Sequence, residues 1–172
     1  AIDATDFYYA KVDVAGDFLW ARHVGGLDLV MAQDLEIDDE EHIYIGGFFW
    51  GTIGWQTANA TSMAFDDLFF AQTDSNGVLN FMEVLHDQGS IDAFGVAVDA
   101  AQNMVISGSF SDTTVIGPTT VYSADFNTEI FVAKYATRSP SLAVLEVLGT
   151  PYCSNDQFQV DFQARGYFPV GN

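Results

Sequence analysis

The sequence predicts an all-β protein built from repeated four-stranded antiparallel units. Three observations predict this class: a phrase that recurs along the chain, short apolar segments of strand length, and turn sequences between those segments. The phrase reads FYYAKV at 7–12, LFFAQT at 68–73 and IFVAKY at 130–135. Each copy follows an acid, and these acids, Asp6, Asp67 and Glu129, are 61 and 62 positions apart. A period of this length indicates a repeat architecture.

Other residues recur at the same offset of 61 positions. They include turn residues, glycines and aromatic residues, in the pairs Asp13 and Asp74, Gly16 and Gly77, Gly47 and Gly108, Trp20 and Phe81, Phe49 and Phe110. The recurring aromatic side chains are predicted to form the core between successive units; they are Trp20, Phe49, Phe81 and Phe110.

Each repeat contains two predicted hairpins. The sequences DVAGD (13–17) and DSNG (74–77) have the Asp and Gly of tight turns. The expected strand pairs are 7–13 with 18–24, 32–38 with 43–49, 68–74 with 79–85, and 94–99 with 104–110. Longer polar connections, 50–66 and 111–128, join the hairpins, and no segment has helical periodicity.

Four strands per repeat, with aromatic and glycine marks in each, is the pattern of a β-propeller blade, and an open β-solenoid is the alternative. The chain then holds about two and a half blades: a half blade at 1–25 and blades at 26–87 and 88–148. Because closed propellers have about 4–8 blades, we expect a segment of a larger propeller. Further blades would lie N-terminal to residue 1, or a partner would pack against the arc.

The repeat resembles the SBBP type of bacterial β-propeller repeat. The resemblance rests on five segments within roughly residues 6–148: Asp6–Trp20, Leu35–Phe49, Asp67–Phe81, Val96–Phe110 and Glu129–Tyr135. It implies a secreted or cell-surface bacterial protein, similar to the adhesins that Bacteroidota export by the type IX system. Gln72 and Thr73 depart from the Lys and aromatic residue of the motif. The stretch 149–172 is interpreted as a linker and the beginning of an Ig-like β-sandwich module.

Composition narrows the choice of partners. The 172 residues include 24 Asp and Glu but only 5 Lys and Arg, for a formal net charge of −19. Nucleic acids and anionic membranes reward Lys and Arg, so neither is an expected partner. No apolar run approaches the ~20 residues of a membrane helix, and no targeting signal is visible, so we interpret the chain as a mature product or a piece of a longer one. Cys153 is the single cysteine, which excludes an internal disulfide and a Cys-based zinc cluster.

No sequence motif for catalysis is present, and the three histidines do not share repeat positions, so no enzyme activity is expected. The acidic turn IDDEEH offers Asp38, Asp39, Glu40 and Glu41 as candidate calcium ligands. The spacing is not that of a known calcium loop, and the equivalent turn VDAAQN keeps only Asp99. The alternative is a solvated hairpin turn, and no other cofactor is expected.

Two tryptophans in the connection 50–66 are the candidate binding residues. Trp50 and Trp55 do not recur at the same offset, so they could form a sugar platform or a protein contact; the alternative is that they cap the edge of the arc. Thr113, within DTT, fits a short O-glycosylation pattern that the resemblance implies.

These observations favour a non-catalytic segment of a large secreted, cell-surface protein that serves adhesion or protein and glycan interaction. The expected partners are further blades, proteins of a surface or secretion complex, and glycans. Two other functions remain open: a carbohydrate-binding propeller within a secreted enzyme, and a secretion cargo captured with its transport partners.

Overall fold

A computed structural model describes residues 4–63, 65–123, 127–137 and 141–148, and within them the protein is all-β with antiparallel sheets. The strands are β1 (Phe7–Val12), β2 (Phe18–Val24), β3 (Leu29–Ile37), β4 (Ile43–Trp50), β5 (Thr52–Trp55), β6 (Ala58–Thr61), β7 (Asp67–Thr73), β8 (Leu79–Leu85), β9 (Ile91–Val98), β10 (Met104–Phe110), β11 (Thr113–Ile116), β12 (Thr119–Tyr122), β13 (Glu129–Ala136) and β14 (Ser141–Leu148). The predicted Ig-like module at 149–172 lies outside the described residues.

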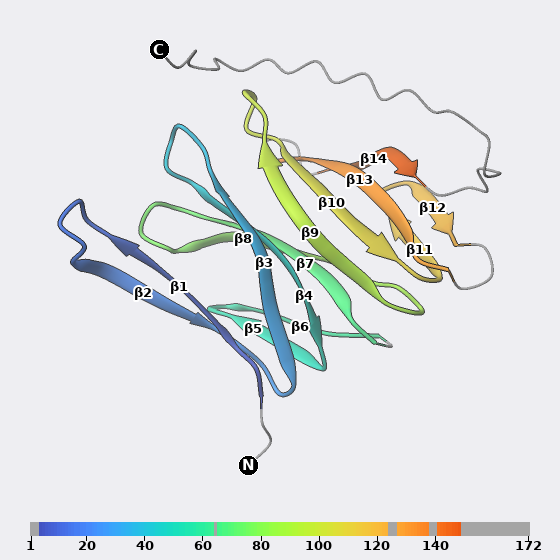
Figure 1. Ribbon diagram of the computed structural model, residues 1–172, viewed down its shortest axis with the longest axis horizontal. Coiled ribbons are helices and arrows are strands. Elements are labelled where there is room, and N and C mark those ends of the chain that lie inside the picture. Colours follow the sequence, from blue (N-terminus) through green and yellow to red (C-terminus); the bar gives the residue numbers. More distant parts are fainter. Residues whose placement is uncertain (1–3, 64, 124–126, 138–140, 149–172) are drawn as a thin grey trace, which may run out of the picture.

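The described strands form two four-stranded meanders and three two-stranded hairpins (Figure 1). Sheet I has the order β3-β4-β7-β8, sheet II has the order β9-β10-β13-β14, and β1 and β2 form the N-terminal hairpin. Strand pairing therefore stays within a repeat, as the predicted hairpins require, instead of running from one repeat to the next. The recurring phrase forms β1, β7 and β13, so it marks the third strand of each four-stranded sheet and the first strand of the N-terminal hairpin.

The longer polar connections, 50–66 and 111–128, contain small hairpins of their own. β5 pairs with β6 in the first connection, and β11 pairs with β12 in the second. Their inward side chains are fully or almost fully buried: Ile53, Trp55, Ile116 and Val121. The sequence did not predict these short strands, because four residues are too few to establish a visible alternation.

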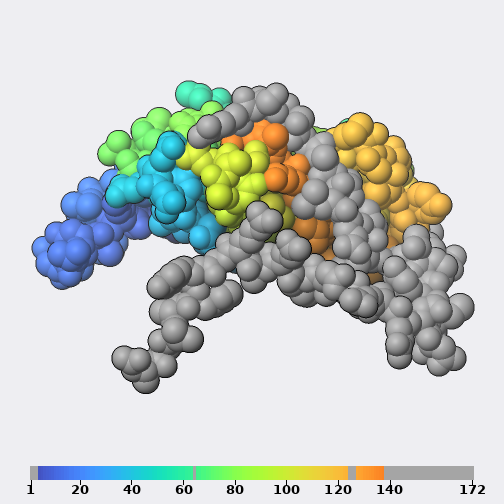
Figure 2. All heavy atoms as spheres, turned by 90° about the horizontal axis from the view of Figure 1, so that it is seen from above, coloured from blue at the N-terminus to red at the C-terminus, as the bar shows by residue number. Residues whose placement is uncertain are grey.

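The sheets pack face to face, with one apolar cluster between each neighbouring pair. The leading face of each sheet points toward the preceding unit and carries Phe69 and Ala71 in sheet I, Phe131 and Ala133 in sheet II. The trailing face of sheet I carries Leu68 and Phe70, which pack against sheet II. Figure 2 shows the resulting succession along the long axis, from β1–β2 (blue) at one end to β11–β12 (yellow to orange) at the other.

The four recurring aromatic side chains lie in these clusters to different depths. Phe49 and Phe110 are fully buried, each in the cluster on the leading face of its sheet. Trp20 and Phe81 lie at the margins of the clusters and are half-buried. Trp20 donates its indole N–H to the carbonyl of Ser75, 3.2 Å away, so this side chain fastens the N-terminal hairpin to the β7–β8 turn.

One five-residue turn closes four of the hairpins. In each, the first residue is an aspartate whose Oδ1 accepts the N–H groups two and four residues later: Asp13, Asp38, Asp74 and Asp99. The fourth residue has a positive φ in every case: Gly16 (90°), Glu41 (62°), Gly77 (71°) and Gln102 (64°). The short aspartate side chain satisfies the backbone of the turn, which explains why an acid recurs there.

Candidate functional site

The predicted calcium turn, 38–41, is one of these aspartate turns. Besides the two backbone N–H groups, Asp38 contacts the ring of His42 at 3.0 Å and accepts the hydroxyl of Tyr44 at 3.0 Å. Burial alone would raise the pKa of Asp38, but these hydrogen bonds together lower it below its usual value. Burial and the neighbouring acids raise the pKa of Tyr44 to about 12, so its hydroxyl stays a donor. Both oxygens of Asp38 therefore serve the turn.

The other acids of this turn point to different partners. Glu41 pairs with Lys11 of β1 at 2.8 Å, while Asp39 and Glu40 have exposed side chains. Within the described ranges, no group of three or more His, Cys, Asp or Glu side chains is arranged to hold a metal ion. Calcium binding by Asp38, Asp39, Glu40 and Glu41 remains a prediction. The hydrogen bonds of the turn explain the presence of an aspartate at position 38 without a metal ion.

Asp38→Ala is expected to destabilise the fold by about 2 kcal/mol at pH 7, because it leaves two backbone N–H groups and the Tyr44 hydroxyl without their acceptor. The lowered pKa means that this stability is present above the unfolded-state pKa of about 3.9 and is lost as the pH falls below it. The difference between the variant and the wild type in urea unfolding should therefore shrink below pH 4. Asp39→Ala, one residue away, is the matched control and should change stability little; equal effects of the two variants would contradict the turn role.

The two predicted binding tryptophans lie in different environments. Trp50, at the end of β4, is 51% exposed and remains a candidate for ligand contact. Trp55 is fully buried, with its ring edge-on to Phe7, Tyr9 and Phe69 and its Nε1 donating to the Tyr9 hydroxyl at 3.2 Å. The prediction that Trp55 forms part of a surface platform is therefore wrong, because the side chain has no exposed face.

Thr113, the predicted O-glycosylation residue, opens β11. It is half-buried, and its hydroxyl lies 3.3 Å from a carboxylate oxygen of Asp112. The next residue, Thr114, is almost completely buried and donates to the carbonyl of His86. Modification of Thr113 remains a prediction.

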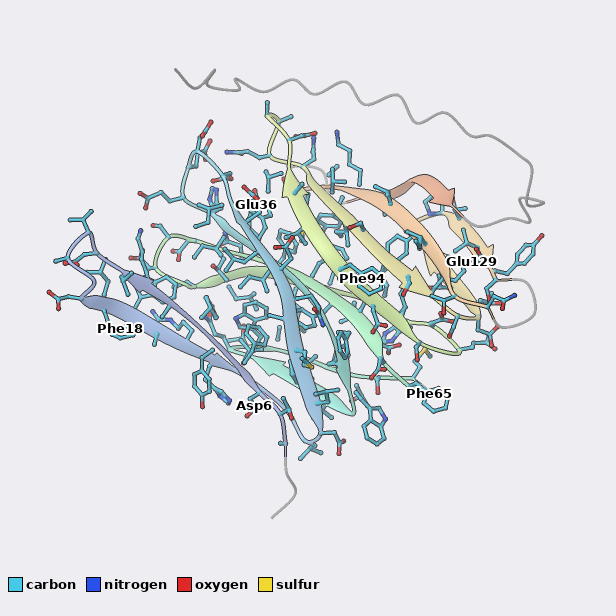
Figure 3. All side chains as sticks on the ribbon, viewed as in Figure 1. Asp6, Phe18, Glu36, Phe65, Phe94 and Glu129 are labelled. Carbon is cyan, nitrogen blue, oxygen red and sulfur yellow. The ribbon has the colours of Figure 1, made fainter. Side chains whose placement is uncertain are left out.

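The acids of the first two copies of the recurring phrase, Asp6 and Asp67, each hold the segment that follows the next strand. Asp6 contacts His23 at 2.8 Å and accepts the N–H of Gly26, while Asp67 contacts His86 and accepts the N–H of Asp87. Sequence comparison missed this relation, because the two histidines are not at equivalent repeat positions. Figure 3 labels Asp6 and Glu129, the acids before the first and third copies.

Acidic side chains gather where sheet I meets sheet II, close to the exposed Phe65 of Figure 3. We name the group Asp66, Asp67, His86, Asp87 and Asp92 the acidic junction. The N–H of Ile91 donates to the carbonyl of Asp66, which links the two sheets there. Burial, followed by the charge of Asp66, raises the pKa of Asp92 to about 6; burial, followed by the charge of Asp67, also raises the pKa of Asp66. Asp92 Oδ1 and Asp87 Oδ2 have no hydrogen-bond partner among the described residues.

Asp92→Asn is expected to stabilise the fold at pH 7. Folding raises the pKa of Asp92 from 3.8 to about 6, so the stability linked to its proton is present below about pH 4 and lost as the pH rises through 6. Two pKa units correspond to about 3 kcal/mol, and solvent screening of this half-buried group reduces the expected gain to about 1–2 kcal/mol. Thermal unfolding at pH 4 and pH 7 should show a higher midpoint for the variant at pH 7 and equal midpoints at pH 4; an equal gain at both pH values would contradict the titration.

An apolar groove lies between β1 and the β3–β4 hairpin. Two adjoining hollows of about 430 and 370 Å³ share Tyr8, Tyr9 and Leu35 in their walls. The first also includes Ile37, Ile43 and both partners of the Lys11–Glu41 ion pair. We name this space the β1 groove; sequence reasoning did not find it, because its walls come from two different repeats.

Within the described residues, the fold defines the class of the protein: it is all-β, with antiparallel sheets stacked face to face. The described part of the chain has no helix long and apolar enough to cross a membrane. The sequence matches no known family model and no curated protein. The resemblance to SBBP repeats therefore stays a prediction.

Proposed function

We propose that this chain is a non-catalytic segment of a large, secreted β-propeller protein of the bacterial cell surface, exported by a type IX-like system, which serves adhesion or protein and glycan interaction. The observation that carries the proposal is the stack of equivalent sheets. Each four-stranded meander packs its leading face on the trailing face of the preceding unit, which is how blades follow one another in a propeller.

The chemistry of the described residues supports a binding role. Two of the predicted calcium ligands have structural partners. Asp38 accepts hydrogen bonds from the backbone of its turn, and Glu41 forms an ion pair with Lys11. Exposed aromatic side chains, by contrast, are available for contact: Trp50, Phe18, Phe65 and Phe94. Aromatic residues are enriched at protein interfaces, and the exposed Trp50 also favours the second candidate function, glycan binding by a propeller within a secreted enzyme.

In the test, the purified chain is attached to beads, and the retention of these beads is measured on surfaces coated with mucin glycans or extracellular-matrix proteins. We expect retention on at least one of these surfaces and no turnover of glycoside or peptide substrates. Trp50→Ala should reduce retention if the ligand is a glycan, whereas Val115→Asp, also on an exposed side chain, should not. Substrate turnover that Asp66→Asn or Asp92→Asn abolishes would overturn the non-catalytic assignment, and the absence of retention on every surface would overturn adhesion.

A further inference from the structure

The N-terminal hairpin has two strands where sheets I and II have four, and no described strand pairs with the inner edge of β1. In sheet I the third strand, β7, pairs with β4 on one side and β8 on the other; in sheet II, β13 pairs with β10 and β14. Its equivalent β1 has β2 as its only strand neighbour among the described residues. The backbone groups on the free edge of β1 are therefore a template for one more strand.

The β1 groove lies where the missing strands would pack. In sheet II, Val96 of β9 is only 7% exposed, and Val98 packs against the same cluster, because both face sheet I. The equivalent residues of β3, Leu35 and Ile37, are 44% and 54% exposed. They line the β1 groove beside Tyr8 of the free strand. The apolar residues that line the groove are therefore exposed, whereas their equivalents in sheet II are covered by sheet I.

The groove also carries one matching charge. In sheet II, Lys134 of the third strand pairs with Asp99, the aspartate of the turn between the first two strands. Lys11 is the equivalent of Lys134, but the described residues of the N-terminal hairpin include no turn equivalent to that of Asp99. Lys11 instead reaches across to Glu41 of the neighbouring sheet. An incoming hairpin with an aspartate turn would provide the lysine with the partner that its equivalent has.

From these three observations we infer that the β1 groove binds a β-hairpin with the pattern of β3–β4, which adds to the edge of β1 and completes a four-stranded sheet. The occupant has two short antiparallel strands, an aspartate turn, and a glycine on the face that meets Leu35. In β4 this glycine is Gly46, where a Cβ atom would lie 2.7 Å from a methyl carbon of Val96, the equivalent of Leu35. The inference rests on the proposed function, because it treats the chain as a section of a longer stack of sheets. It adds the kind of partner that binds at this end of the stack, a β-hairpin.

The probe is a fluorescein-labelled synthetic peptide with the sequence of residues 29–50, titrated with the whole chain and followed by fluorescence anisotropy. We expect saturable binding that Leu35→Asp and Ile37→Asp each weaken at least tenfold. Val115→Asp, another exposed apolar position, is the matched control and should bind as the wild type does. A peptide that carries Gly46→Val should not compete, because the added side chain prevents close approach to the groove.

A second measurement locates the peptide. Hydrogen exchange of the bound complex should show slowed exchange of β1 amides, with unchanged exchange in β11–β12. No binding, or binding that Leu35→Asp leaves unchanged, would overturn the inference, and so would slowed exchange confined to sheet II. Dimerisation of the chain that Leu35→Asp abolishes, without peptide binding, would assign the groove to a second copy instead. These outcomes are independent of bead retention on glycans and matrix proteins, so either proposal can fail alone.

Discussion

Trp55→Ala is expected to lower the free energy of unfolding by about 3–5 kcal/mol, the range for removal of a large buried aromatic side chain. The indole is fully buried between the N-terminal hairpin and sheet I. Its removal leaves a cavity beside Phe7 and Phe69 and removes the hydrogen bond that the indole N–H donates to the Tyr9 hydroxyl. The loss should therefore also loosen the N-terminal hairpin, which that cluster attaches to sheet I.

Urea unfolding followed by circular dichroism measures this effect, with two control variants. Trp50→Ala removes a half-exposed indole and should change the free energy of unfolding by less than about 0.5 kcal/mol. Trp55→Phe keeps most of the apolar volume and should fall between the wild type and Trp55→Ala. Wild-type stability of Trp55→Ala together with lost glycan retention would restore Trp55 as a ligand-binding residue.

Gly47→Ala is expected to destabilise the fold by about 3 kcal/mol, at the upper end of the cost of overpacking. A Cβ atom on Gly47 would lie 2.0 Å from the carbonyl oxygen of Met31 and 2.9 Å from the ring of Phe69. β4 is held between β3 and β7 in the middle of sheet I, so the backbone has little room to move. The ring of Phe69 covers this glycine as its direct cross-strand neighbour, an arrangement in which an aromatic side chain compensates for the missing one.

Gly54→Ala is the matched control for this prediction. Gly54 also lies in a strand, but its nearest contact for a Cβ atom is the carbonyl oxygen of Gly25 at 3.4 Å. This variant should be neutral or slightly stabilising in thermal unfolding, since alanine restricts the unfolded chain more than glycine does. Equal destabilisation by both substitutions would show that general glycine effects, and not the contact with Met31, determine the result.

The repeat itself made much of the fold predictable. The pairing of Gly47 with Phe69 in sheet I recurs as the pairing of Gly108 with Phe131 in sheet II. The recurring glycine and aromatic residues of the sequence therefore indicate a cross-strand contact that is present in both sheets. The four aspartate turns were equally visible as a turn signal, although two of them place Glu41 and Gln102 at a positive φ where glycine is expected. Their shared aspartate bonds explain how a non-glycine residue is held there.

The misses have physical causes. The prediction that Trp55 could form a surface platform rests on its failure to recur, but its equivalent, Ile116, is also fully buried. Both repeats have a buried apolar side chain at this position, but the two side chains differ in size. A search for identical residues at equivalent positions does not detect such a similarity. The acidic junction and the β1 groove were missed for another reason: each collects side chains from more than one repeat, so only the packing of units brings them together.

The five-residue aspartate turn has a consequence for how such a chain can diversify. Hydrogen bonds determine its first residue and a positive φ constrains its fourth, whereas its third residue is exposed in all four turns, DVAGD, DDEEH, DSNGV and DAAQN. A gene that grows by duplication can therefore alter this exposed position of every turn without disturbing the sheets beneath it. The hairpin tips become sites where charge and shape evolve independently of folding, one duplicated unit at a time.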